Sequence, residues 1–105
     1  MLSEQLQHFV ADKADDMKAA DIVTLDVRDT SSLTDYMVLC TGNSKRHVAS
    51  IADHVAEEAK AAEVGLLGME GQREGEWVVL DLGNVMVHVM QEEQRELYQL
   101  EKLWN

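Results

Sequence analysis

One stretch of the chain, EWVVLDLGNVMVHVM at residues 76–90, restricts the possible folds more than any other. Two runs rich in Val and Leu flank Gly83-Asn84, a residue pair that favours the two-residue turn of a β-hairpin. A turn of this length places Leu82 opposite Val85 and thereby fixes the register of the two strands. The predicted cross-strand pairs are Trp77 with Met90, Val79 with His88, and Asp81 with Met86.

Side-chain alternation along the strands divides this hairpin into two faces. One face is entirely apolar and is expected to lie in the core: Val78, Leu80, Leu82, Val85, Val87 and Val89. The other mixes apolar side chains with one carboxylate and one imidazole: Trp77, Val79, Asp81, Met86, His88 and Met90. A solvent-exposed sheet face is ordinarily polar, so this second face is either covered by a helix or open for a partner.

Apolar periodicity over the rest of the chain predicts three helices and four or five strands. The expected elements are a helix at 3–20 with Ser3 as its N-cap, strands at 22–28 and 36–41, a helix after the Gly42-Asn43-Ser44 turn, a short edge strand within 65–71, the hairpin, and a last helix after Met90. Three helices can cover one face of such a sheet but hardly two. We therefore predict an α+β fold, a mixed four- to five-stranded sheet with helices mainly on one face, and an open second face at the hairpin.

The charge balance favours a protein partner over nucleic acid. Twenty acidic and nine basic residues give a formal charge of −11, which repels phosphates and attracts basic proteins, although acidity can also serve solubility alone. A chain of 105 residues is expected to form one domain, 1–105, and it has no apolar run of membrane-spanning length. The single cysteine, Cys40, excludes an internal disulfide and favours a cytoplasmic location. Little direct nucleic-acid binding and no membrane association are expected.

A basic cluster follows the Gly42-Asn43-Ser44 turn. Ser44, Lys45 and Arg46 would lie at a helix N-terminus, where free N–H groups favour anions, so an anion contact is possible there. The spacings of the known phosphate-binding loops are absent, and an ordinary capped helix start is the competing interpretation. His47 and His54 are two helical turns apart and cannot chelate one metal ion by themselves, so no metal site is predicted.

No complete catalytic site is visible. Asp81 and His88 lie diagonally across the hairpin and could form a hydrogen bond, but no nucleophile accompanies them, so we predict neither enzymatic activity nor a cofactor. Cys40 is expected to be a buried packing residue. In the last helix, Arg95 is assigned with the neighbouring acids to a solvated face, and one apolar face is expected to carry Leu97, Leu100 and Trp104.

Two segments resemble the ribosomal silencing factors of the Iojap family: DVRDTSSLTDYMVLCTGNSKRHVASIADHV at 26–55 and EWVVLDLGNVMVHVMQEEQRELYQLEKLWN at 76–105. The resemblance implies a nucleotidyltransferase-like α/β core without the catalytic carboxylates. It further implies binding to a basic protein on the intersubunit face of the large ribosomal subunit, which blocks joining of the small subunit and represses translation. Members of the family also form homodimers, and organellar relatives are linked to assembly of the large subunit.

Combined with this resemblance, the second hairpin face becomes the expected partner-binding surface. Its predicted members, with two acidic residues at the rim, are Trp77, Val79, Asp81, Met86, His88, Met90, Glu70 and Glu76. Two alternatives remain open from the sequence. One is a nucleotidyltransferase-like enzyme or nucleotide-binding protein using the turn at 42–44, and the other is an assembly factor for the large subunit.

Overall fold

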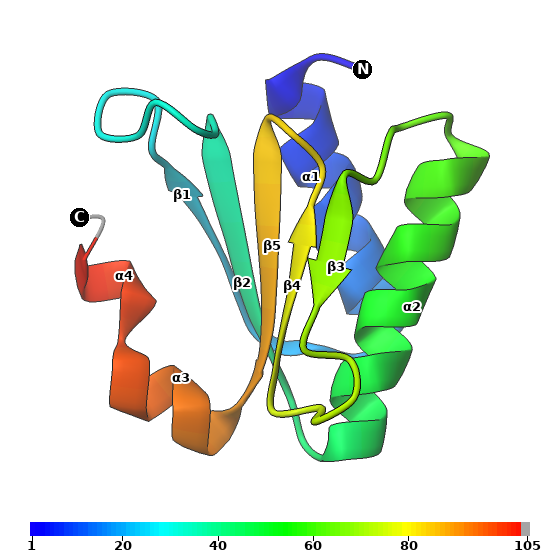
Figure 1. Cartoon of the computed structure of the whole chain (residues 1–105), viewed down its shortest axis with the longest axis vertical. Helices are drawn as coiled ribbons and strands as arrows, with labels where there is room; N and C mark the ends of the chain where they lie inside the picture. Colours follow the sequence, from blue (N-terminus) through cyan, green and yellow to red (C-terminus); the bar gives the residue numbers. More distant parts are fainter. Residues whose placement is uncertain (104–105) are drawn as a thin grey trace.

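A computed structural model describes residues 1–103 of the chain (Figure 1). Five strands form one sheet, with two long helices against one face and two short helices against the other. In chain order the elements are α1 (Ser3–Asp16), β1 (Ala20–Asp26), β2 (Tyr36–Gly42), α2 (Lys45–Ala61), β3 (Gly68–Glu70), β4 (Trp77–Asp81), β5 (Val85–Gln91), α3 (Glu92–Tyr98) and α4 (Leu100–Leu103).

The sheet is mixed and has the strand order β1-β2-β5-β4-β3. β2 and β5 pair in parallel at the centre, and the other three pairs are antiparallel. The hairpin of β4 and β5 has the predicted register, with Trp77 opposite Met90, Val79 opposite His88 and Asp81 opposite Met86. The prediction of an α+β fold with a mixed sheet is therefore confirmed.

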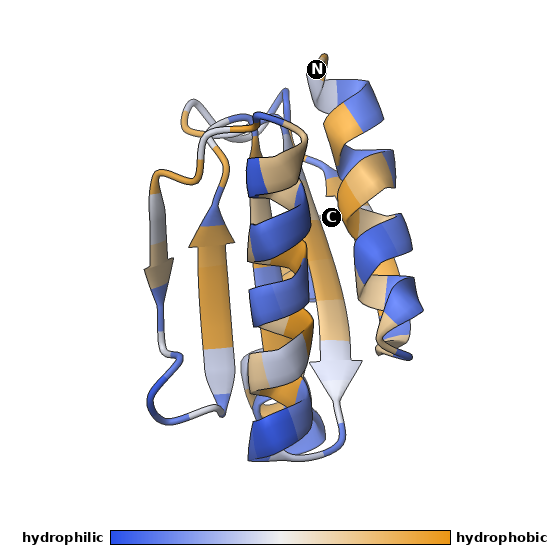
Figure 2. Cartoon of the chain, turned by 90° about the vertical axis from the view of Figure 1, so that its right-hand side faces the viewer, coloured by the Kyte–Doolittle hydropathy of each residue, from blue (hydrophilic) through white to orange (hydrophobic). Residues whose placement is uncertain are grey.

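The main core lies between the sheet and the layer of α1 and α2. The apolar hairpin face predicted to be core is fully or almost fully buried there: Val78, Leu80, Leu82, Val85, Val87 and Val89. From the other side, α1 and α2 contribute a stripe of small and branched side chains: Val10, Ala14, Val48, Ile51, Ala52, Val55 and Ala59. Figure 2 shows the mainly hydrophilic face of α2 turned away from the sheet, as expected for an amphipathic helix.

The second face of the sheet is less open than predicted, because the C-terminal segment forms two helices instead of one. Gln99 adopts a left-handed conformation (φ 46°, ψ 53°) that ends α3 and redirects the chain into α4. Leu100 then packs against the sheet in a second, smaller core with Val27, Met37, Leu39 and Met90. Leu97, expected on the packed face, is instead 71% exposed, and Trp104 lies outside the described residues.

The element boundaries shift by a few residues from those predicted. Helix α1 ends at Asp16, four residues early, and its N-cap is Leu2, not Ser3. The side-chain Oε1 of Gln5 accepts a hydrogen bond from the N–H of Leu2 at 3.2 Å, which stabilises this start. Strand β1 begins two residues early, at Ala20, because the chain reverses within three residues of α1 with Lys18 at a positive φ of 60°.

Candidate partner-binding surface

The uncovered part of the second sheet face lies over β3, β4 and the first half of β5. Cross-strand pairing places Glu70 beside Val79 and Val79 beside His88, with Leu39 of β2 next in the same row. Leu39 is fully buried under the C-terminal helices, whereas Val79 is only partly buried and Glu70 is exposed. The boundary between the covered and the open areas therefore runs along β5.

Two of the predicted surface residues lie on the covered side of this boundary. Met90 is fully buried and His88 is only 9% exposed, so their assignment to an open surface is wrong. The cause is Leu100 of α4, which fills the space in front of Met90, and α3, which follows β5 directly. Trp77, Val79, Asp81 and Met86 remain partly exposed.

The indole ring of Trp77 contacts two other ring side chains, His88 and Tyr98. Its Nε1–H donates a hydrogen bond to Nδ1 of His88 at 3.0 Å, and the two ring centroids are 5.9 Å apart. The ring of Tyr98, on α3, lies 4.9 Å from the indole at an interplanar angle of 43°. The three aromatic side chains thus come from β4, β5 and α3, and the tilted Trp77–Tyr98 arrangement is a favourable one for aromatic pairs.

His88 serves this arrangement as a neutral acceptor. An indole N–H can only donate, so Nδ1 of His88 must carry no proton and the proton must be on Nε2. Burial lowers the pKa of His88 from 6.5 to about 4, which keeps the ring neutral near pH 7. The predicted hydrogen bond between His88 and Asp81 is not formed, because Oδ1 of Asp81 instead accepts from the N–H of Gly83 in the hairpin turn.

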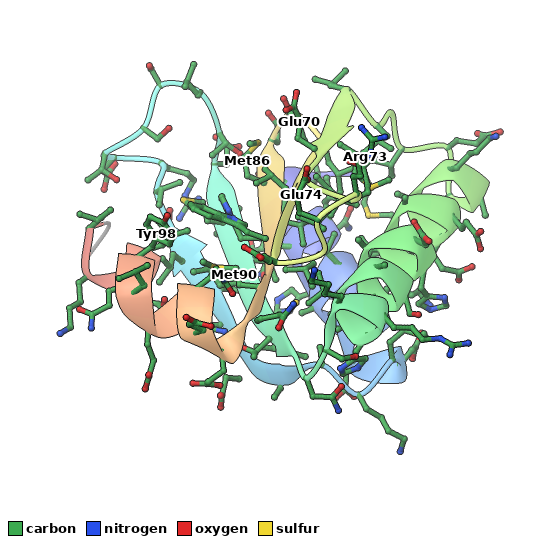
Figure 3. All side chains as sticks on the ribbon, turned by 60° about the horizontal axis from the view of Figure 1, so that its bottom comes forward. Glu70, Arg73, Glu74, Met86, Met90 and Tyr98 are labelled. Atoms are coloured by element: carbon green, nitrogen blue, oxygen red, sulfur yellow. The ribbon has the colours of Figure 1, made fainter. Side chains whose placement is uncertain are left out.

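Tyr98 also belongs to this surface, although its sequence context did not predict an exposed position there. It is 49% exposed and lies at the end of α3, on the same side of the sheet as Met86 and Met90 (Figure 3). It stands among mainly polar residues of α3, and the sequence alone did not indicate which strand its ring would contact. Together with the partly exposed residues above, it extends the apolar patch from β4 and β5 across to α3.

Acidic side chains border this patch. Glu70, on the edge strand β3, is exposed beside Val79, and Asp81 follows Val79 on the same face of β4. Glu76 is exposed immediately before Trp77, where its Oε2 accepts from Nε2 of Gln94 at 3.3 Å. We use the name docking surface for the patch and its rim, which comprise Glu70, Glu76, Trp77, Val79, Asp81, Met86 and Tyr98.

The helix that carries Tyr98 is fastened to the sheet by Arg95. Nη1 of Arg95 donates to Oγ1 of Thr41 on β2 at 2.9 Å, and Nε donates to Oε2 of Glu101 on α4 at 3.1 Å. Arg95 is only 7% exposed, so its assignment to a solvated helix face is wrong. Its hydrogen bonds join β2, α3 and α4, and they hold both short helices over the sheet.

The loop between β3 and β4 supports Trp77 from the backbone side. Gly71 has φ +90°, and a Cβ built on it would lie 2.0 Å from the carbonyl oxygen of Trp77. At the other end of the loop, the carbonyl of Gly75 accepts from Nε2 of Gln91 at 2.9 Å. A glycine is therefore required at position 71, because the backbone there passes too close to the carbonyl of Trp77 to leave room for a side chain.

The Gly42-Asn43-Ser44 turn is a conventional helix start. Oγ of Ser44 accepts from the N–H of His47 at 3.0 Å and caps α2, as the competing interpretation of this motif predicted. Nδ1 of His47 accepts from the N–H of Asn43 at 2.9 Å, and Nε2 of His47 donates to the carbonyl of Met17 at 2.8 Å, which links α2 to the end of α1. Lys45 and Arg46 are exposed and form no ion pair among residues 1–103, and the anion contact stays a prediction.

Two further residue predictions concern possible reactivity. Cys40 is fully buried in β2, and burial raises the pKa of its thiol to about 12, so its role is packing, as predicted. Within residues 1–103, no group of three or more His, Cys, Asp or Glu side chains is placed to hold a metal ion. None of the helices that the structure describes is both long and apolar enough to cross a bilayer.

Comparison with known proteins places this architecture in a family. A family model described as "Ribosomal silencing factor during starvation" matches residues 2–105. The chain belongs to the ribosomal silencing factor family. A ribosomal silencing factor of Haemophilus influenzae is 48% identical to it over 99 residues, which are 94% of this chain and 97% of that protein. The family resemblance drawn from the two sequence segments is therefore confirmed.

Two further relatives, with lower sequence identity, extend the comparison. A crystal structure of a Chromobacterium violaceum protein superimposes with a TM-score of 0.97 at 38% identity and covers 99% of this chain and 87% of that one. A mouse protein named for mitochondrial assembly of the large ribosomal subunit is 33% identical over 89 residues, 82% of this chain and 39% of that protein. The names of the family model and of the Haemophilus influenzae relative describe ribosomal silencing, and the name of the mouse relative describes ribosome assembly; none of these names describes catalysis.

Proposed function

We propose that this chain binds the large ribosomal subunit through a basic ribosomal protein on the intersubunit face and thereby prevents the small subunit from joining. The proposal follows the family role, and the docking surface is the part of the molecule assigned to the contact. Translation is repressed because a large subunit occupied in this way is withdrawn from the pool that can form whole ribosomes. No chemical step on a substrate is involved.

The single observation that carries the site assignment is the incomplete cover of the hairpin. Two long helices close one face of the sheet, and α3 and α4 close part of the other, yet Trp77 and Met86 stay partly exposed beside an exposed Tyr98. Aromatic side chains and Met are enriched at the centres of protein interfaces, and Trp is a frequent hot spot. Such a patch is the expected form of a protein contact.

The acidic rim favours a basic partner. Glu70, Glu76 and Asp81 border the apolar patch, and the whole chain carries a formal charge of −11. Carboxylates at the rim of an interface contribute mainly by steering an oppositely charged partner and by rejecting phosphate-rich surfaces. Lysine and arginine side chains of a ribosomal protein would satisfy them, whereas ribosomal RNA would not, so little direct nucleic-acid binding is proposed.

The block to subunit joining is steric. The described chain measures about 32 × 31 × 20 Å along its principal axes. The layer of α1 and α2 lies on the side of the sheet opposite the docking surface (Figure 1). With the docking surface against the large subunit, this layer would project into the gap between the subunits. A spacer of this thickness exceeds the reach of direct side-chain contacts several-fold.

Two related activities are compatible with the same surface. Assembly of the large subunit is favoured as a second function by the name of the mouse relative, and it would require the same docking contact. A homodimer formed through the docking surface would compete with ribosome binding. Either activity would take place in the cytoplasm, where we place the protein because its family acts on ribosomes.

Two charge reversals test the docking surface. Glu70→Lys on the rim and Glu57→Lys on the exposed side of α2 change the net charge equally, so general attraction to RNA is matched between them. We expect Glu70→Lys, but not Glu57→Lys, to weaken co-sedimentation with purified large subunits and to lose the block to subunit joining. Trp77→Ala should weaken binding by about 2 kcal/mol, a loss of roughly 30-fold in affinity.

The same assays also decide against the proposal if it is wrong. Equal binding by Glu70→Lys and Glu57→Lys would place the contact elsewhere on the chain. Whole ribosomes that form normally in the presence of stoichiometric parent protein would refute the anti-association role itself. In that case, a defect in large-subunit maturation on depletion of the protein would support the assembly function instead.

A further inference from the structure

The indole of Trp77 is fixed before any partner arrives. Its single polar group is satisfied by the bond to Nδ1 of His88 at 3.0 Å, and the ring of Tyr98 lies 4.9 Å from it. A surface tryptophan without such neighbours samples several rotamers and loses that freedom on binding. Here, one side chain of β5 and one of α3 restrict it in the free protein.

The supporting groups are themselves rigidly placed. His88 is on β5, paired on both sides with Val79 of β4 and Leu39 of β2, and is only 9% exposed. Tyr98 follows Arg95 by about one helical turn, and Arg95 is bonded to Thr41 of β2 at 2.9 Å. The support for the indole therefore rests on the central strands of the sheet and not on a loop.

We infer that His88 is a positioning residue: its hydrogen bond to Trp77 holds the indole in the orientation that the partner meets. The inference rests on the proposed function, because it assumes that Trp77 is part of the contact. Holding one large side chain in its bound rotamer avoids an ordering cost that corresponds to about fivefold in affinity. His88 itself does not touch the partner, which explains how a buried residue can influence docking.

Two substitutions separate the hydrogen bond from the packing of the imidazole. His88→Asn keeps an acceptor, because Oδ1 of asparagine is as many bonds from Cα as Nδ1 of histidine. His88→Leu fills similar space and removes the acceptor. Trp77→Ala and the double variant of Trp77→Ala with His88→Leu complete a cycle, which measures whether His88 acts through Trp77.

The first readout is the exchange of the Trp77 Nε1–H with water, followed by NMR on the free protein. The chain has two tryptophans, and Trp77→Ala assigns the signal. We expect slow exchange in the parent chain and in His88→Asn, and faster exchange in His88→Leu. Thermal unfolding of each variant at pH 7 shows whether it is folded before binding is compared.

The second readout is the affinity for purified large subunits. We expect His88→Leu to bind about fivefold more weakly than the parent, His88→Asn to recover most of that loss, and His88→Leu to have no further effect in the Trp77→Ala background. An equal loss with and without Trp77 would mean that His88 acts through general structure, and it would overturn the inference. Unchanged exchange in His88→Leu would overturn it too.

The cycle also distinguishes the failure of this inference from failure of the proposed docking surface. If Trp77→Ala binds more weakly than the parent while His88→Leu exchanges faster yet binds normally, the docking surface stands and the positioning role is refuted. If Trp77→Ala binds as well as the parent, the docking surface is refuted and the positioning role falls with it.

Discussion

Acid should destabilise this protein through His88. Burial lowers the pKa of His88 from 6.5 to about 4, so the folded state resists a proton that the unfolded chain accepts readily. Between these two pH values the unfolded state binds one more proton, and the free energy of unfolding falls as the pH falls. The contribution of His88 is fully present above about pH 6.5 and is lost progressively down to about pH 4.

The size of the effect follows from that difference in pKa. Each pKa unit corresponds to about 1.4 kcal/mol, so the full loss is roughly 3 kcal/mol, of which about 2 kcal/mol is reached at pH 5. Trp77 adds to the same penalty, because a protonated His88 can no longer accept its indole N–H. A loss of this size is a large fraction of the stability of a small domain.

Urea unfolding followed at several pH values from 8 to 4.5 measures this effect. The informative quantity is the difference between the parent and His88→Asn, since the asparagine does not titrate while the carboxylates titrate in both proteins. We expect that difference to change by about 2 kcal/mol between pH 8 and pH 5. His8→Asn, at an exposed position of α1, is the matched control. A flat difference curve for His88→Asn would refute the reasoning.

Two other substitutions test how the docking surface is supported. Gly71→Ala should lower the free energy of unfolding by about 2 kcal/mol or more, because φ at Gly71 is +90° and the added Cβ would meet the carbonyl of Trp77. Gly65→Ala is the control: no atom lies within 4 Å of its added Cβ, so it should lower the free energy of unfolding by less than about 1 kcal/mol. Arg95→Ala should lower the free energy of unfolding by about 3 kcal/mol and expose Leu100, because it removes the hydrogen bonds of Arg95 to Thr41 on β2 and to Glu101 on α4. Lys102→Ala, at an exposed position of α4, is the matched control. Chemical denaturation measures all four, and equal stability within either pair would contradict the prediction.

The pairing of residues in the hairpin could be predicted because its sequence pattern is compatible with only one register. A two-residue turn fixes the register, and a shift by one residue would expose six apolar side chains of the face that carries Val78 and Val87. The cap of α2 was likewise readable, since Ser44 precedes an amphipathic stripe. In both segments the turn or cap residues and the pattern of apolar side chains indicate the same structure, and for that reason the structure could be predicted from the sequence.

The C-terminal segment could not be predicted in this way. The side chains of α3 that contact the rest of the molecule are mostly polar, so no apolar stripe marked its inner side: Gln94, Arg95 and Tyr98. The break between α3 and α4 occurs at Gln99, which adopts a left-handed conformation. A glycine at this position would have predicted the end of the helix, whereas a glutamine does not. The burial of Met90 and His88 follows from this turn, and for that reason the extent of the open surface was overestimated.

The partial cover is also what makes the remaining surface suitable for binding. A face left entirely bare would present Met90, Leu39 and Met37 as one continuous apolar patch and invite nonspecific association. The C-terminal helices bury these side chains and use Tyr98 to brace Trp77, so only a few anchors stay in contact with solvent. An interface of few fixed anchors and an acidic rim gains specificity from geometry, while the net charge of −11 speeds encounter with a basic partner. Helices α3 and α4 therefore reduce the area of the docking surface and also determine which side chains remain exposed on it.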